Sequence, residues 1–87
     1  MATVWIPALL REFTHGQAQI TLPGHTVSQV IDALEDAYPG IEDRLCKDGQ
    51  LNPAIQTLVD GRVALLGLLE PVDEHSEVVF VPVVAGG

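Results

Sequence analysis

One segment of the sequence has the pattern of an amphipathic helix, and it restricts the possible folds more than any other segment. Its apolar residues are spaced three and four apart, which places them on one helix face: Val27, Val30, Ile31, Leu34 and Tyr38. Thr26 and Gln29 have the capping-box spacing that begins a helix, and Pro39-Gly40 ends it. This apolar stripe must be buried against another element, which the rest of the chain has to supply.

The segments on both sides of the predicted helix have the composition and alternation of short strands. Strands are expected over Thr3 to Leu10, Gln17 to Leu22, Ile55 to Val59, Arg62 to Leu65 and Val78 to Val81. Asp60-Gly61 is typical of a type I′ hairpin turn, which needs positive φ at both central residues. One main helix packed on one mixed sheet is the β-grasp architecture. The sequence therefore predicts an α+β fold of the ubiquitin-like, β-grasp type.

Strand alternation predicts which side chains enter the core and which face outward. The core is expected to join Val4, Ile6, Leu58, Val78 and Phe80 of the sheet to Val27, Ile31 and Leu34 of the helix. Trp5, Pro7, Val79 and Val81 then lie on the opposite face. An exposed apolar patch on a small domain marks a protein interface. We therefore predict a partner-binding surface made of Trp5, Pro7, Val79, Val81 and Pro82.

Length and charge exclude several classes of function. A chain of 87 residues forms one domain that is too small for an enzyme with a deep cleft of its own. Twelve acidic residues against four basic ones give a net charge of -8, which argues against nucleic acid and anionic membrane as partners. The apolar runs are too short to span a bilayer, and the N-terminus has no signal-peptide pattern. The single cysteine fits a reducing, cytoplasmic location.

The last residues of the chain form a distinct segment. Pro82 follows the last predicted strand and is expected to stop it, because proline has no N–H for a strand ladder. The sequence therefore divides into a domain of residues 1–81 and a flexible tail of residues 82–87. Val83 to Gly87 can span about 17 Å when extended. Gly86 and Gly87 lack Cβ atoms, so a narrow channel could close around their backbone.

The ending Pro-Val-Val-Ala-Gly-Gly resembles the C-terminus of the ubiquitin-like sulfur carrier proteins. The resemblance extends to Leu10-Arg11, Thr26-Val27, Tyr38-Pro39-Gly40-Ile41 and Val59-Asp60-Gly61. Within the family, the chain looks most similar to the carriers for cysteine synthesis, with the molybdopterin type as the other assignment. One departure is His75 in Glu74-His75-Ser76-Glu77-Val78, where the family usually has glycine in a turn. A left-handed backbone there would favour glycine over histidine.

The resemblance implies a carrier and not an enzyme. An activating enzyme of the ubiquitin-activating type would use ATP to adenylate the Gly87 carboxylate, and sulfur would then form a thiocarboxylate. Ala85 and Gly86 would belong to the inserted tail, and no cofactor would be bound by the carrier itself. The acceptor of the sulfur would be a cysteine synthase or the large subunit of molybdopterin synthase. Two alternatives remain: a protein modifier conjugated through Gly87, and a non-covalent β-grasp adaptor.

Other residues with chemical potential have simpler interpretations. His15, His25 and His75 lack metal-ligand spacing, so no metal site is expected. Cys46 stands alone and is interpreted as half-buried packing. The acidic residues Asp32, Glu35 and Asp36 are interpreted as the solvated face of the helix, or else as a surface that steers a basic partner.

Overall fold

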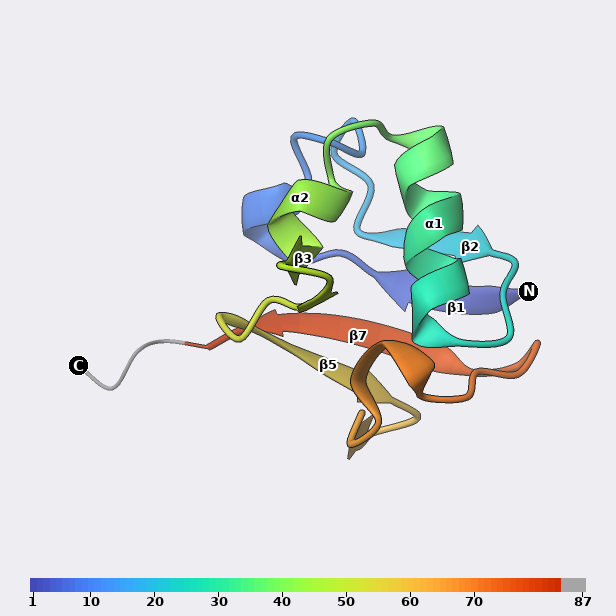
Figure 1. Ribbon diagram of the computed structural model, residues 1–87. Coiled ribbons are helices and arrows are strands. Elements are labelled where there is room, and N and C mark those ends of the chain that lie inside the picture. The colour runs from blue at the N-terminus through green and yellow to red at the C-terminus, as the bar shows by residue number, and fades with distance from the viewer. Residues whose placement is uncertain (84–87) are drawn as a thin grey trace.

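The protein, as a computed structural model, is described over residues 1–83, and these form one sheet with a main helix packed across one face (Figure 1). The elements, in chain order, are β1 (Ala2–Trp5), η1 (Ala8–Leu10), β2 (Gln19–Leu22), α1 (Val27–Ala37), α2 (Glu42–Leu45), β3 (Cys46–Lys47), β4 (Gln50–Leu51), β5 (Ile55–Val59), β6 (Arg62–Val63), η2 (Gly67–Leu69) and β7 (Glu77–Pro82). Within this part of the chain, no helix is long and apolar enough to cross a membrane.

The main sheet has the strand order β2-β1-β7-β5-β6. β7 lies parallel to β1 and antiparallel to β5, while the β1–β2 and β5–β6 pairs are antiparallel. A separate two-stranded ladder joins β3 to β4. The predicted mixed sheet with one main helix is confirmed, and β7, the last strand of the described residues, occupies the centre of the sheet.

α1 begins and ends where the sequence predicted. The Thr26 side chain accepts a hydrogen bond from the Gln29 backbone N–H at 3.2 Å. The Gln29 side chain in turn accepts one from the His25 N–H at 2.8 Å. The Thr26 side chain thus caps a free donor of the first turn, and the Gln29 side chain pairs with the N–H of the residue before the cap. The predicted apolar stripe faces the sheet, with Val27, Val30, Ile31 and Leu34 at most 1% exposed.

The prediction that Leu58 belongs to the core is wrong. Ile55, Thr57 and Val59 are the buried residues of β5, so Leu58 lies on the opposite face and is half-buried. Both Leu58 and its neighbour Val59 are apolar, and the two residues before them are both polar, with Gln56 exposed and Thr57 buried, so the sequence pattern of β5 does not distinguish its faces. A shift of one residue in register exchanges the two faces of a strand.

Several strand ends also differ from the prediction. β1 stops at Trp5, and Pro7 precedes the short helix η1 in place of a longer strand. β6 ends at Val63. β7 includes Pro82, and the Val83 N–H still donates to the Ala54 carbonyl at 2.8 Å, so the prediction that Pro82 stops the strand is wrong. Proline is tolerated in this position because it is at the end of the strand.

The turn at Asp60-Gly61 forms as predicted. Asp60 and Gly61 have φ values of 53° and 79°, as a type I′ turn requires. His75, by contrast, is not among the residues with positive φ. Its N–H donates to the Asp73 side chain at 2.7 Å. The turn before β7 is therefore built by side-chain hydrogen bonds and does not need a left-handed residue.

Glu35 has a structural role that the sequence did not indicate. Its carboxylate accepts hydrogen bonds from the backbone N–H groups of Gly40 and Glu42, both at 2.9 Å. These bonds lower the pKa of Glu35 below its ordinary value of 4.5. Glu35 thereby holds the connection from α1 to α2, whereas Asp32 and Asp36 are exposed. The interpretation of all three acids as a solvated face is wrong for Glu35.

This role predicts a pH-dependent effect of replacing Glu35 with glutamine. Because the folded pKa of Glu35 is depressed, its carboxylate stabilises the fold above pH 4.5, and this stabilisation is lost as the pH falls through the folded pKa. Glu35→Gln should therefore lower the free energy of unfolding at neutral pH, and the difference from wild type should shrink below pH 4.5. Urea unfolding at a series of pH values measures both.

Asp36→Asn is the matched control, since Asp36 is an exposed acid on the same helix. A difference between Glu35→Gln and wild type that stays constant from neutral pH to below pH 4.5 would contradict the assigned role.

Candidate functional site

A row of apolar side chains crosses the sheet on the face opposite α1. The strand registers pair Trp5 with Val79, Val79 with Leu58, and Leu58 with Val63. Residues paired in this way lie side by side on the same face, and their sequence neighbours Val4, Val78 and Val59 are buried on the other face. We call Trp5, Val79, Leu58 and Val63 the outer row.

Only part of the outer row was predicted. Trp5 and Val79 were placed on this face by strand alternation, while Leu58 and Val63 were missed. Trp5 is 37% exposed and Val63 is 46% exposed, so the row ends in accessible apolar side chains at both sides. Gln56, which shares a strand face with Leu58, was the one local signal for this position, but Thr57 beside it is also polar and is buried.

Trp5 is oriented by a polar contact on the same face. Its indole Nε1–H donates to the Glu77 carboxylate at 3.2 Å, and Glu77 is paired with Thr3 in the register of β1 and β7. The contact satisfies the polar edge of the indole and leaves its apolar surface for another molecule, an arrangement that makes tryptophan frequent at protein interfaces.

The apolar surface continues from the outer row toward the C-terminus along β7. Val81 is the next outward residue after Val79, lies opposite Gln56 and is 38% exposed. Pro82 and Val83 follow and are exposed. Pro7 does not join this surface through a strand, since β1 ends before it, and Pro7 is half-buried.

The end of β7 lies beside the start of β5. Pro82 is paired with Ile55, and Val83 is hydrogen-bonded to Ala54. The predicted tail residues Ala85 and Gly86, and the predicted sulfur-bearing residue Gly87, lie outside the described residues. The outer row thus leads along one strand to the point from which these residues continue.

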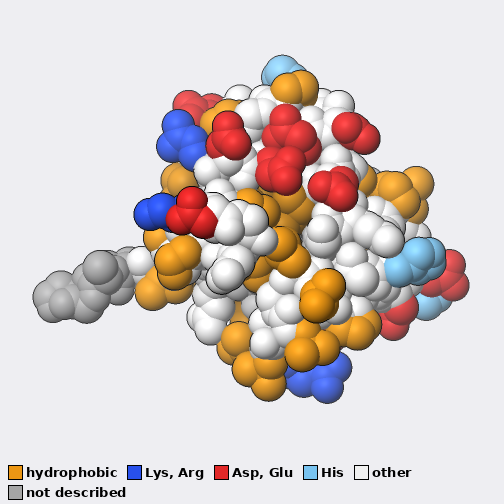
Figure 2. Space-filling model, viewed as in Figure 1, with side chains coloured by type: hydrophobic (Ala, Val, Ile, Leu, Met, Phe, Trp, Pro, Cys, Tyr) orange, Lys and Arg blue, Asp and Glu red, His pale blue; other side chains and the backbone are white. Residues whose placement is uncertain are grey.

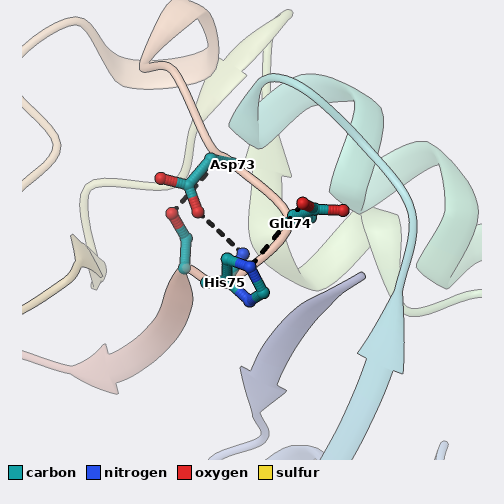
Figure 3. A network of polar contacts seen from close by, with 4 residues as sticks. Asp73, Glu74 and His75 are labelled. Carbon is teal, nitrogen blue, oxygen red and sulfur yellow. Dashed lines mark hydrogen bonds and ion pairs between the residues drawn. The ribbon is translucent and has the colours of Figure 1, made fainter.

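A polar network closes the opposite end of β7 (Figure 3). The Ser76 hydroxyl accepts from the Asp73 N–H and donates to the Asp60 carboxylate, both at 3.0 Å. Asp60 also accepts from the Glu77 N–H at 2.9 Å. The His75 and Glu74 side chains make an ion-pair contact of 3.6 Å and are largely exposed. This network fixes the start of β7 against the β5–β6 turn.

A second group of exposed apolar residues was not predicted. Leu65, Leu66 and Leu69 are 88%, 61% and 74% exposed, and hydrophobic side chains gather around η2 and β6 in Figure 2. The same view shows acidic side chains over α1 and α2. The leucines follow β6 directly, so they begin two residues after Val63, the end of the outer row.

The described residues contain neither a metal-ligating cluster nor an activated thiol. Among residues 1–83, no group of three or more His, Cys, Asp or Glu side chains could hold a metal ion. Burial raises the pKa of the Cys46 thiol, and the negative charges of Glu42 and Asp32 raise it further. A raised pKa keeps the thiol protonated and weakly nucleophilic at neutral pH, consistent with the interpretation of Cys46 as packing.

The chain is similar to known carriers and modifiers over most of its length. The sulfur carrier protein CysO of Mycobacterium tuberculosis is 34% identical over 90 residues, which cover 98% of this chain and 97% of the relative. Small archaeal modifier protein 3 of Haloferax volcanii is 39% identical over 64 residues, covering 71% of this chain and 70% of the relative.

The fold is shared as well. A chain in the crystal structure of the Amycolatopsis orientalis BexX/CysO complex matches with a TM-score of 0.94 and 34% identity, over 100% of both chains. The family model described as the ThiS family matches residues 4–87. The resemblance inferred from the sequence is confirmed, and the chain belongs to the ThiS family of ubiquitin-like sulfur carrier proteins.

Proposed function

We propose that this protein carries sulfur as a thiocarboxylate on Gly87 and delivers it for cysteine biosynthesis. The observation that carries the proposal is the continuity of the outer row with the root of the tail. One strand, β7, supplies Val79 and Val81 to the exposed apolar face and ends in the segment that continues to the terminal carboxylate. A partner that docks on this face is positioned to receive the tail.

The chemistry needs a carboxylate that a partner can activate. A Gly87 carboxylate oxygen attacks the α-phosphorus of ATP in the activating enzyme, which releases pyrophosphate and leaves an acyl adenylate. A sulfide-level sulfur nucleophile then attacks the acyl carbon and displaces AMP, giving the thiocarboxylate. The carrier supplies the carboxylate and the docking surface, while the partner supplies ATP and the catalytic groups.

The carrier's body selects the acceptor, because every carrier of this type presents the same terminal group. The match to CysO covers nearly the whole chain and supports cysteine synthesis over molybdopterin synthesis. The match to a small archaeal modifier protein supports a second candidate function, in which Gly87 is conjugated to a lysine of a target protein. Both functions begin with the same adenylate.

The outer row predicts a loss of affinity when Trp5 is replaced. Trp5→Ala should weaken binding to the cognate activating enzyme by about 2 kcal/mol, the usual cost of removing an aromatic anchor. Titration calorimetry with the full-length carrier measures the change. Leu66→Ala, which removes an exposed leucine outside the outer row, is the control and should bind as wild type. Equal affinities of wild type and the folded Trp5→Ala variant would exclude this face.

The terminal glycines predict loss of activation without loss of stability. Deletion of Gly87, or Gly86→Trp, should abolish pyrophosphate exchange with ATP and the activating enzyme, because the adenylated carboxylate is displaced or cannot enter the site. The unfolding midpoint in urea should stay unchanged. Exchange that continues at the wild-type rate in the deletion variant would refute the carrier role.

The acceptor is identified by the mass of the product. When the thiocarboxylated protein is mixed with a candidate cysteine synthase and an activated serine, we expect a product that is heavier than the unmodified carrier by one cysteinyl residue, whose sulfur is the one that the thiocarboxylate carried. Thiocarboxylated protein with the large molybdopterin synthase subunit and a pterin precursor is the parallel reaction. Sulfur transfer there with no cysteinyl adduct would assign the molybdopterin pathway, and recovery of the protein linked to a lysine of another protein would assign conjugation.

A further inference from the structure

Asn52 uses all four of its polar groups to join α2 to the start of β5. Its backbone N–H donates to the Leu45 carbonyl at 2.8 Å, and its carbonyl accepts from the Ile55 N–H at 2.9 Å. Its side-chain Nδ2 donates to the Arg44 carbonyl at 3.0 Å, and Oδ1 accepts from the Ala54 N–H at 2.9 Å. Asn52 is half-buried, and because both its backbone groups and both its side-chain groups are hydrogen-bonded, its position is restrained.

Asn52 lies close in the structure to the end of β7, where the tail begins. Ala54, whose N–H is held by the Asn52 side chain, accepts the Val83 N–H through its carbonyl at 2.8 Å. Pro82 has no N–H to donate. The Val83–Ala54 bond therefore holds this end of β7 to the sheet, and we call Pro82 and Val83 the tail root. A path of hydrogen bonds runs from α2 through Asn52 and Ala54 to Val83.

We propose that Asn52 is a positioning residue that fixes where the tail leaves the domain, and this proposal rests on the sulfur-carrier function proposed above. With Val83 held, four residues remain to carry the carboxylate, with a reach of about 14 Å. If Val83 and Pro82 came away from β5, the reach would grow by about 7 Å. The carboxylate would then sample a larger volume, and its effective concentration in the partner's active site would fall.

Amide hydrogen exchange tests whether Asn52 holds the tail root. Asn52→Ala removes both side-chain bonds, whereas Asn52→Asp keeps the acceptor for Ala54 and loses the donor to Arg44. Measured by NMR, exchange at the Val83 amide should rise about fivefold or more in Asn52→Ala, as expected for the loss of one hydrogen bond's stabilisation. Asn52→Asp should give a smaller rise. Gln50→Ala, a neutral side-chain truncation in the neighbouring β4, is the control and should leave Val83 unchanged.

The Val78 amide in the same strand separates this effect from general destabilisation. If exchange at Val78 rises by the same factor as at Val83, or if exchange at Val83 does not change, Asn52 does not hold the tail root and the proposal is overturned.

Pyrophosphate exchange tests the consequence for function, at a temperature where all variants are folded. For Asn52→Ala the KM for the carrier should rise about three- to tenfold with kcat unchanged, because the added freedom of the tail is lost on binding and not in the chemical step. A loosened Val83 with wild-type KM would overturn the proposal. If wild-type protein gives no exchange at all, the carrier function itself fails, and the Val83 measurement still decides whether Asn52 holds the tail root.

Discussion

The pairing of β7 with both β1 and β5 is the interaction on which the rest of the structure depends. β7 is the last strand of the described residues and the central strand of the sheet, so the sheet is incomplete until residues 77–82 are in place. Val78 and Phe80 point from it into the core under α1, at most 2% exposed. The same strand therefore supplies core side chains, the outward residues Val79 and Val81, and the start of the tail.

Alternation along β7 connects stability to recognition. Because successive side chains point to opposite faces, burying Val78 and Phe80 obliges Val79 and Val81 to face outward. Their exposure costs some solubility, and a net charge of -8 opposes the self-association that an apolar face would otherwise favour. Acidic side chains gather over α1 and α2 in Figure 2.

In three connections between elements, polar side chains bind backbone N–H or C=O groups. Glu35 binds the N–H groups of the turn after α1, Asn52 joins α2 to β5, and Asp60 joins the β5–β6 turn to the start of β7. Each satisfies backbone groups that would otherwise lack a partner. Two of these side chains lie at opposite ends of β7: Asp60 is at its start, and Asn52 is beside its end.

The sequence by itself determined the helix, its Thr26 cap, the Asp60-Gly61 turn and the outward position of Trp5, because these depend on residues close together in the chain. The family resemblance and the Gly-Gly ending were likewise readable without a structure. Only the tertiary structure decided the register of β5, the strand end beyond Pro82, and the roles of Glu35 and Asn52. Leu58 and Val59 are both apolar, and of the two polar residues before them Gln56 is exposed while Thr57 is buried. Polarity alone therefore leaves the faces of β5 ambiguous, and they are decided by pairing with β7, which lies about twenty residues further along the chain. Val83 stays on the sheet because Ala54 is beside it, and such contacts between distant segments leave no local pattern in the sequence.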